Sequence, residues 1–277
     1  MIYGCCKEER GDPSSFKGYG IMIVLKTAQE IEQLRMSSQI VANVLSELSR
    51  HITPGITTKE LDDMAEESAR AQGALPAFKG YRGFPASLCA SINDQIVHGI
   101  PDGRKLKEGD IISLDFGTKL NGFYGDAAVT LPVGKIGKRT EELLLVTEES
   151  LYKGIEQALV GNRLSDISQA IQAHVEKHGF SVVRDFVGHG IGTALHEEPQ
   201  IPNFGVPIPN PRLQEGMIFA IEPMVNEGSY EMRILSDGWT AVTADGKLSA
   251  HFEHTIAITS NGPLILTEHP ERKKGKL

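Results

Sequence analysis

Cysteine and long apolar runs are both scarce in this sequence. Only three cysteines, Cys5, Cys6 and Cys89, occur among the 277 residues, which is too few for a disulfide framework. The longest apolar run near the start is Ile21–Leu25, far short of the roughly 18 residues that a membrane-spanning helix needs. No secretory signal precedes the first cysteines. These absences predict a cytoplasmic protein with no membrane partner.

Positive charge is also in short supply. Lys and Arg number 28 against 36 Asp and Glu, which gives a net charge of −8 and a pI of about 5.6. Nucleic-acid-binding proteins are more often basic, so the composition argues against a specific nucleic-acid partner. Hydrophobic residues, at 40%, are by contrast numerous enough to build the core of one large domain or two small ones.

The two ends of the chain differ from the segment between them. Residues 1–21 contain Gly, Pro and charges without apolar periodicity, which predicts a flexible N-terminal tail, and Met22 is an alternative start. Residues 269–277 form a short basic tail that we expect to be solvated. The pattern Thr27-x-x-Glu30 is a capping box that marks the start of a helix. Residues 22–268 are therefore expected to form a single domain.

An internal repeat with a spacing of 107 residues lies between the tails. The segments 108–115 (EGDIISLD) and 215–222 (EGMIFAIE) share the pattern E-G-x-I-x-x-[L/I]-[D/E]. Upstream of each, a glycine pair brackets a segment of the same length, Gly55 to Gly73 and Gly161 to Gly179. Because both matches keep the same register to within one residue, we interpret them as an internal duplication.

Each copy is predicted to contain a helix followed by strands. Apolar residues recur at helical spacing over Thr57–Gln72 and from Leu164 to Val175. The expected strands are Asp110–Phe116, Gly125–Leu131, Met217–Val225 and His251–Thr259. The predicted fold is α+β, with two halves related by a pseudo-twofold axis, sheets inside, helices outside and a cleft on the axis.

Four of the predicted strands carry an acidic residue among apolar neighbours. These residues are Asp115, Asp126, Glu222 and Glu253. A carboxylate in a buried strand is costly unless it is paired, hydrogen-bonded or bound to a metal. One such residue alone is compatible with a structural acid. Four at equivalent places in two repeats predict a single acidic cluster that needs cations to stay ionised.

Histidines near the same motifs offer nitrogen ligands. His189 lies in GHGIG, His196 follows seven residues later in LHEEP, and His98 lies in an irregular segment. Four carboxylates with one or two imidazoles suit Mn²⁺, Fe²⁺ or Co²⁺ and are compatible with Zn²⁺, and two bridging carboxylates could hold a pair of ions. His174 and His178 lie on or just beyond a helix, where we expect them to be exposed or to cap the helix.

The order of these residues resembles that of the type I methionine aminopeptidases. The resemblance runs from about Met22 to Thr267 and is carried by the motifs GHGIG, HEEPQI, IEPM and FEHT. That family has the pita-bread fold, which agrees with the internal duplication. The resemblance implies a cytoplasmic metallo-exopeptidase that removes the initiator methionine from nascent chains and prefers a small second residue.

The resemblance also implies a role for each residue of the site. Two divalent cations (Fe, Mn, Co or Zn) would be held by five ligands, with Asp126 and Glu253 bridging, and the substrate's amino group would bind beside Asp115. The ligands would be Asp115, Asp126, His189, Glu222 and Glu253. A metal-activated water would attack the first peptide bond while Glu222 accepts its proton. His98 would contact the scissile amide, and His196 would stabilise the oxyanion.

The methionine side chain is implied to bind in a largely apolar pocket. Its residues would be Tyr81, Phe84, Cys89 and Trp239, with Phe78 and Leu195 at its edge. Three of them depart from the residues common in bacterial relatives. Phe78 stands where a cysteine is common, Phe84 where a tyrosine is common and Leu195 where a phenylalanine is common. These departures leave the reaction intact, and they leave the shape of the pocket open.

Three other functions share this fold or scaffold. A proline-directed peptidase would carry a further N-terminal domain, for which about 25 residues are too few. A metal-free, creatinase-like hydrolase or a non-catalytic binding protein would be expected to lose metal ligands, and all five are present. We therefore expect a monomeric enzyme whose partners are the N-terminal methionine of nascent polypeptides and, transiently, the ribosome.

Overall fold

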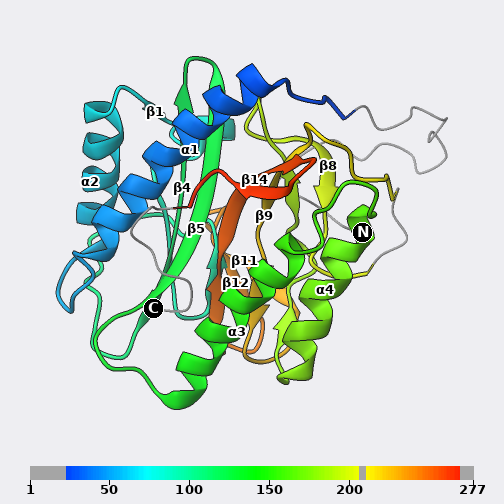
Figure 1. The fold of residues 1–277 in the computed structure, drawn as a ribbon. Helices are drawn as coiled ribbons and strands as arrows, with labels where there is room; N and C mark the ends of the chain where they lie inside the picture. Colours follow the sequence, from blue (N-terminus) through cyan, green and yellow to red (C-terminus); the bar gives the residue numbers. More distant parts are fainter. Residues whose placement is uncertain (1–22, 206–209, 269–277) are drawn as a thin grey trace.

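The computed structural model describes residues 23–205 and 210–268. Both predicted tails, 1–21 and 269–277, lie outside the described residues, so their flexibility stays a prediction. Figure 1 shows the described chain as a strongly curved sheet with long helices laid across it. Within these ranges, none of the helices combines the length and the apolar character needed to cross a bilayer.

Two of the long helices begin at capping boxes that the sequence displays. The long helices are α1 (Ala28–Ser49), α2 (Thr58–Ala71), α3 (Lys138–Ile155) and α4 (Leu164–Lys177). The capping box predicted at Thr27 and Glu30 is confirmed, since each residue bonds to the backbone N–H of the other. Thr57 and Glu60 form the same box before α2.

A nine-stranded antiparallel sheet forms the centre of the molecule, in the order β1-β4-β5-β14-β9-β7-β8 with β2 added to β4 and β15 to β14. Its strands are β1 (Leu75–Pro76), β2 (Cys89–Ile92), β4 (Ile111–Leu120), β5 (Phe123–Pro132), β7 (Gly188–Gly190), β8 (Glu197–Ile201), β9 (Ile218–Ile221), β14 (Glu253–Thr259) and β15 (Gly262–Ile265). The halves of the chain meet where β5 pairs with β14.

Two small three-stranded sheets accompany the central one, and the first contains parts of two strands that the sequence predicted. They contain β13 (Ser249–His251), β10 (Met224–Asn226) and β6 (Ser181–Val182), and β11 (Met232–Ile234), β12 (Ala241–Thr243) and β3 (Gln95–Val97). The expected strand Met217–Val225 is divided after Ile221, because Pro223 has no N–H to donate to a ladder. The strand expected over His251–Thr259 is likewise divided, at Phe252, and its first part pairs in the smaller sheet.

The duplication is visible in the backbone. Strands β4 and β9 begin at Ile111 and Ile218, the same 107-residue spacing as the motifs that contain them. The glycines just before them, Gly109 and Gly216, have φ angles of +91° and +90°, a conformation that favours glycine. Helices α2 and α4 each have 14 residues. The predicted pseudo-twofold α+β fold is confirmed.

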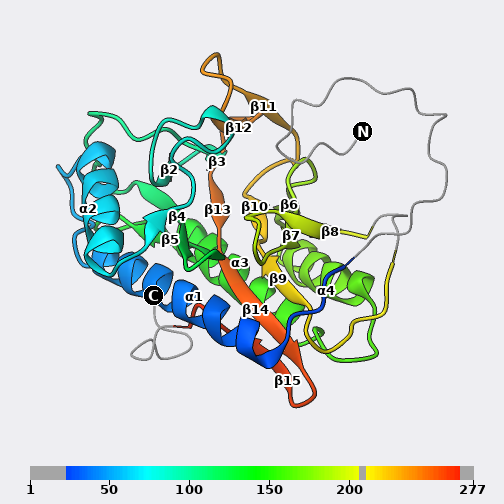
Figure 2. The ribbon, with the colours of Figure 1, turned by 90° about the horizontal axis from the view of Figure 1, so that it is seen from above.

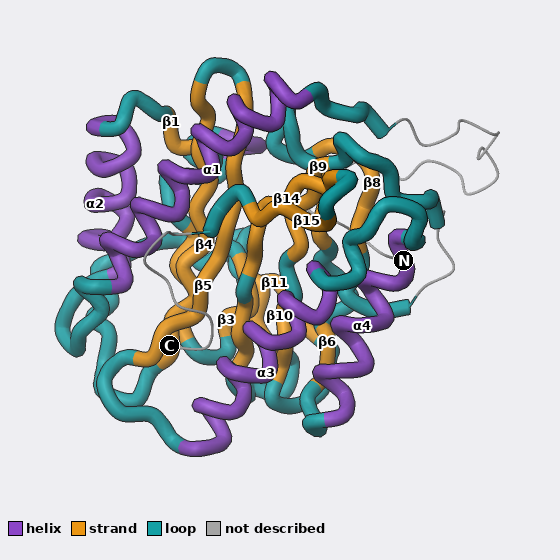
Figure 3. The backbone as a smooth tube through the Cα atoms, viewed as in Figure 1, coloured by secondary structure: helices purple, strands orange, loops and turns teal. Residues whose placement is uncertain are grey.

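The helices cover one face of the central sheet. α1 packs across β4 and β5, and α3 packs against α4. Viewed from above, α1 lies on one side of β4 and β5, and β3, β11 and β12 lie on the other (Figure 2). Figure 3 shows the same layering by colour, with helices in front of the strands. The largest core cluster fills the space between the helices and the sheet, so the site residues lie on the opposite, concave side.

Candidate active site

One pocket gathers all the site residues that the sequence named. It is lined by Phe78, Tyr81, Phe84, Cys89, His98, Asp115, Asp126, His189, Leu195, His196, Glu222, Trp239 and Glu253. Asp115 and Asp126 come from β4 and β5 in the first half of the chain, whereas His189 and Glu253 come from β7 and β14 in the second half. The pocket therefore depends on both halves.

The register of three neighbouring strands places three carboxylates on one face of the sheet. Ala128 on β5 lies opposite Asp115 on β4 and opposite Glu253 on β14. Residues directly opposite in a ladder point to the same face, and so do residues two apart in one strand, which adds Asp126. The carboxylates therefore converge because of ordinary strand pairing.

Several oxygens of this cluster are buried without a hydrogen-bond partner among the described residues. They are Oδ1 of Asp115, Oδ1 of Asp126 and Oε1 of Glu253. Ligand atoms of Asp126, His189 and Glu253 all lie within 4.8 Å of one another. Because buried polar atoms in native proteins are almost always satisfied, this donor set fits a divalent cation.

Burial and mutual repulsion perturb the acids of the cluster strongly. Burial raises the pKa of Asp115 to about 7. Burial, and then the charges of the other cluster carboxyls, raise the pKa values of Asp126, Glu222 and Glu253 well above their ordinary range. Like charges held this close cannot all ionise unless a cation balances them.

His189 presents the nitrogen that a metal ligand needs. Its Nδ1 lies 2.9 Å from the carbonyl oxygen of Gly190, which can only accept, so Nδ1 carries the proton. Nε2 then keeps its lone pair, and it lies 3.6 Å from Oε1 of Glu222. Burial lowers the pKa of His189 to about 4, so the ring is neutral. A backbone carbonyl that fixes the tautomer is a usual companion of metal-binding histidines.

The other two predicted histidines border the cluster. Burial lowers the pKa of His98 to about 4, and its ring meets those of Phe186 and Trp239 edge to face. His196 lies with its ring centroid 4.3 Å from that of His189, and its Nδ1 is 2.7 Å from the hydroxyl of Tyr81. Burial, followed by neighbouring positive groups, lowers the pKa of His196 to about 2. Both rings are therefore neutral near pH 7.

An apolar wall completes the pocket beside the acids. Phe84 and Trp239 meet edge to face with centroids 5.2 Å apart, and Tyr81, Cys89 and Leu195 belong to the same hydrophobic cluster. Phe78 packs against Gly117, where an added Cβ would lie only 2.8 Å from its ring. The large residue at position 78 is thus accommodated by glycine on the neighbouring strand.

His251 is a site neighbour that the sequence analysis missed. Its side chain is about 1% exposed, and neither ring nitrogen has a hydrogen-bond partner among the described residues. Its Nε2 lies 3.8 Å from Oε2 of Glu222. The available signal was its position two residues before Glu253 in an extended segment, which predicts that both side chains face the same way.

The histidines set aside by the sequence analysis lie on the last helix. His178 is the C-cap residue of α4, as expected for a capping role. His174 contacts Glu149 on α3, with Nε2 2.9 Å from Oε2.

The sequence matches the family described as metallopeptidase family M24 over residues 32–260. Methionine aminopeptidase of Clostridium perfringens and methionine aminopeptidase 1 of Bacillus subtilis are each 58% identical to it over 246 residues, covering 89% of this chain and 99% of the relative.

Solved structures show the same relationship. The methionine aminopeptidase of Thermotoga maritima superposes with a TM-score of 0.87 at 48% identity, covering 90% of this chain and all of that one. The prolidase of Pyrococcus furiosus, 23% identical with a TM-score of 0.70, shares the fold, and this chain spans 66% of its length. The chain belongs to metallopeptidase family M24 and, within it, to the bacterial-type methionine aminopeptidases.

Proposed function

We propose that this chain hydrolyses the first peptide bond of peptides and nascent proteins that begin with methionine and have a small second residue. The observation that carries this proposal is a buried cluster of carboxylates that shares one pocket with an apolar wall. The name of the curated relatives at 58% identity supports methionine as the first residue.

We assign two divalent cations to the cluster. Their proposed ligands are Asp115, Asp126, His189, Glu222 and Glu253. By the resemblance to the family, Asp126 and Glu253 would be the ligands shared by both ions, and they lie on the paired strands β5 and β14 at the junction of the halves. An oxygen-rich set with one imidazole suits Mn²⁺, Fe²⁺ or Co²⁺ and is compatible with Zn²⁺. When bound, such ions act as Lewis acids that polarise a carbonyl and activate water.

The proton transfers are assigned to the chain's own groups. Glu222 follows the end of β9, and its carboxylate faces His189 and His251. We assign it as the acceptor of the proton from the attacking water. We assign His98 to a hydrogen bond with the scissile amide or its leaving nitrogen.

His196 is proposed to stabilise the oxyanion. We assign the Tyr81 hydroxyl, 2.7 Å from Nδ1, as the donor of this contact, which places the proton of the neutral His196 ring on Nε2. An Nε2–H group is the donor that a developing negative oxygen requires.

The remaining surfaces of the pocket account for substrate selection. The methionine side chain is assigned to the wall made by Tyr81, Phe84, Cys89 and Trp239, bordered by Phe78 and Leu195. The free amino group is assigned to the Asp115 end of the cluster, which restricts cleavage to the first bond. A second residue near the acids must then be small.

The test is a set of tripeptides given to the metal-loaded protein. We expect methionine to be released from Met-Ala-Ser and Met-Gly-Ser, with little release from Met-Lys-Ser or Met-Phe-Ser. Xaa-Pro peptides that begin with another residue should not be cleaved. Elemental analysis of the same preparation, with two ions per chain expected, checks the cluster assignment. Equal rates for small and bulky second residues would contradict the proposed selectivity.

We further propose that the enzyme acts as a cytoplasmic monomer that meets nascent chains through transient ribosome contact. Analytical ultracentrifugation of the purified chain checks the monomer, and cosedimentation with translating ribosomes checks the contact.

A further inference from the structure

The wall of the pocket formed by residues 77–89 has little regular structure of its own. It leaves the sheet after Ala77, whose N–H donates to the carbonyl of Gly117 (2.9 Å), and returns at Cys89, where β2 begins. Between these points it contains one short 3-10 turn, Tyr81–Gly83. Four of the pocket residues lie on it: Phe78, Tyr81, Phe84 and Cys89. Contacts with other elements must therefore contribute to its position.

Asp62 on α2 holds the far end of this wall. Its Oδ1 accepts hydrogen bonds from the backbone N–H groups of Ser87 (2.8 Å) and Leu88 (3.0 Å). Asp62 is only 5% exposed, and both of these bonds are buried. Buried N–H groups that lose their acceptor are costly, so this carboxylate fixes the backbone just before Cys89.

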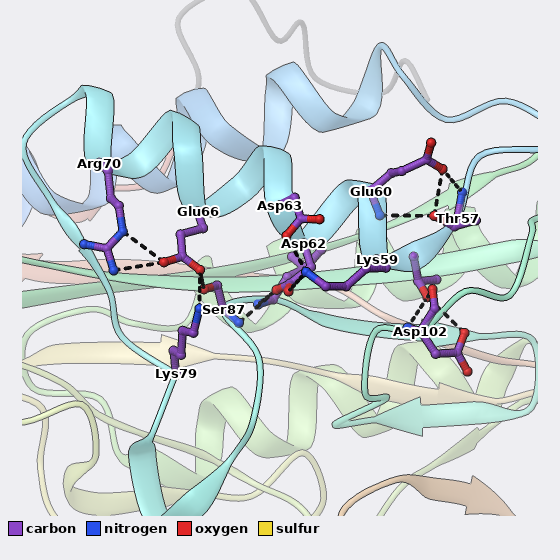
Figure 4. Close-up of polar contacts among 12 residues, drawn as sticks. Thr57, Lys59, Glu60, Asp62, Asp63, Glu66, Arg70, Lys79, Ser87 and Asp102 are labelled. Carbon is purple, nitrogen blue, oxygen red and sulfur yellow. Dashed lines mark hydrogen bonds and ion pairs between the residues drawn. The ribbon is translucent and has the colours of Figure 1, made fainter.

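Glu66, one turn further along α2, joins the two ends of the wall. Its Oε2 accepts both from Nζ of Lys79 (2.7 Å) and from the hydroxyl of Ser87 (2.8 Å). Figure 4 shows both partners meeting one oxygen of Glu66, with Arg70 on its other oxygen. Lys79 follows Phe78 directly and Ser87 lies two residues before Cys89, so one oxygen spans the segment that carries the pocket residues.

The charge of Glu66 persists at any pH at which the enzyme would be assayed. The hydrogen bond from Lys79, and then that from Ser87, lower the pKa of this carboxyl to about 2. Its contacts with the wall are therefore charge-assisted hydrogen bonds, which are stronger than neutral ones.

We propose that Asp62 and Glu66 are positioning residues that hold the 77–89 wall against the pocket and thereby set its selectivity for an unbranched first side chain. The inference rests on the proposed function for the identity of that side chain. Neither carboxylate lines the pocket. Both act through the backbone and side chains of the wall, one step removed from the substrate.

Other acids on α2 provide matched controls. Glu67 is exposed, and Asp63 pairs with Lys59, whose Nζ also lies 3.4 Å from Oδ2 of Asp62, so Glu67→Gln is the control that leaves Asp62 untouched. Asp63→Asn and Glu67→Gln each remove one negative charge from α2 without touching the 77–89 wall. They separate the loss of the contacts that Asp62 and Glu66 make to the wall, here called the anchor, from the loss of negative charge on α2.

The first readout is steady-state kinetics of the full chain loaded with Mn²⁺, on Met-Ala-Ser and Leu-Ala-Ser. Asp62→Leu and Glu66→Met are each expected to raise KM for Met-Ala-Ser about tenfold, with kcat within about threefold of the parent. The preference for methionine over leucine should narrow by a similar factor. Asp62→Asn and Glu66→Gln keep an acceptor oxygen and should recover most of the loss.

The second readout needs no turnover. Trp239 is the one tryptophan of the sequence, and its ring meets Phe84 of the wall. Its emission and its quenching by acrylamide therefore report on the wall directly. We expect quenching to increase in Asp62→Leu and Glu66→Met and to match the parent in the two controls, with unchanged manganese content in all variants.

The outcomes separate this inference from the proposed function. If the parent protein does not cleave Met-Ala-Ser, the proposed function fails, and the fluorescence still tests the anchor. If folded Asp62→Leu and Glu66→Met match the controls in KM and in quenching, the anchor is overturned. Should Asp62→Leu fail to fold, Glu66→Met and Ser87→Ala carry the same test on a more exposed contact.

Discussion

The two walls of the pocket are held by the same kind of contact, made by different parts of the chain. In the 77–89 wall, Asp62 accepts from two consecutive backbone N–H groups. In a second wall, residues 192–197, Oε1 of Glu197 accepts from the N–H groups of Thr193 (2.8 Å) and Ala194 (3.2 Å). Each wall is thus fixed by a carboxylate on paired amides.

The walls differ in the lysine that completes each anchor. Lys79, which pairs with Glu66, has a side chain that is 51% exposed. Lys26, which pairs with Glu197 at 2.7 Å, has a side chain that is 3% exposed. Its backbone N–H also donates to the carbonyl of Gly216 (2.7 Å), in the second half of the chain. The lysine contact of the first wall therefore lies at the surface, whereas that of the second lies inside the protein and is made by the segment that precedes α1.

Removing one proposed bridging carboxylate from each half is expected to have the largest effect. Asp126→Asn acts on the first half and Glu253→Gln on the second, and both remove a negative charge from the same cluster. Changes to groups that only orient a ligand typically cost ten- to a hundredfold in metal affinity, so loss of a ligand should cost about a hundredfold or more. Titration with Mn²⁺ measures it. A large loss in only one variant would show that the halves contribute unequally.

Removing either His98 or His196 is expected to slow the reaction while the pocket keeps its metal. His98→Ala and His196→Ala should each lower kcat by about 10²–10³, because a single donor to the transition state is lost. Metal content by elemental analysis, taken alongside kinetics on Met-Ala-Ser, is the check. Loss of metal in either variant would make that histidine a ligand.

The pH dependence of stability should reveal the buried acids of the pocket. Their folded-state pKa values are raised, that of Asp115 to about 7. Below about pH 6.5 the buried histidines oppose these acids, because burial holds their pKa values at about 4 or lower and they are protonated only in the unfolded chain. Above about pH 6.5 only the acids differ between the two states, so the metal-free folded protein binds more protons than the unfolded chain and its stability should fall as the pH rises through 7. Thermal melts with a chelator check this direction. Mn²⁺, which binds the ionised acids, should stabilise more at pH 7.5 than at pH 5.

Exchanging each anchoring lysine for methionine compares the walls directly. Lys26→Met leaves Glu197 without its buried partner and should cost roughly 3 kcal/mol in the free energy of unfolding. Lys79→Met breaks a pair at the surface and should cost under about 1 kcal/mol. Denaturant unfolding of the metal-free proteins measures both. Equal costs would mean that the two anchors are equivalent after all.

Much of the architecture could be predicted from the sequence because the duplication repeats local signals. The capping box at Thr27, the glycines before β4 and β9, and the apolar strands each act over a few residues. The division after Ile221 was also signalled, by Pro223, although the prediction continued the strand through it. Helix α3 was not predicted.

The residues of the site likewise include some that local sequence signals predict and others that they do not. Its acids follow from strand patterns and its histidines from compact motifs, whereas the identity of the pocket residues came from resemblance. The anchors were invisible in the sequence, because Lys26 and Glu197 are 171 residues apart and only the folded chain brings them together. Asp62 and Asp63 are likewise adjacent acids that only tertiary contacts distinguish.

Deleting residues 1–21 is expected to have the smallest effect. The segment has no apolar periodicity, and Lys26 is retained, so the melting temperature should stay within about 2 °C of the parent and activity should be nearly unchanged. A second truncation, which lacks residues 1–26, also removes Lys26 and so shows the effect of losing the lysine contact of the second wall. Differential scanning calorimetry and kinetics on both truncations test the pair, and a large loss in the shorter deletion would show that residues 1–21 pack on the domain.

The duplicated plan has a consequence for dividing the protein. The chain passes from β5, which ends at Pro132, to α3, which begins at Lys138, through one short connection. A cut there leaves Asp115 and Asp126 on one fragment and His189, Glu222 and Glu253 on the other. Neither fragment holds the whole proposed ligand set, so binding of metal at this site would require both fragments together. A spectroscopically visible ion such as Co²⁺ would therefore report that the fragments have associated.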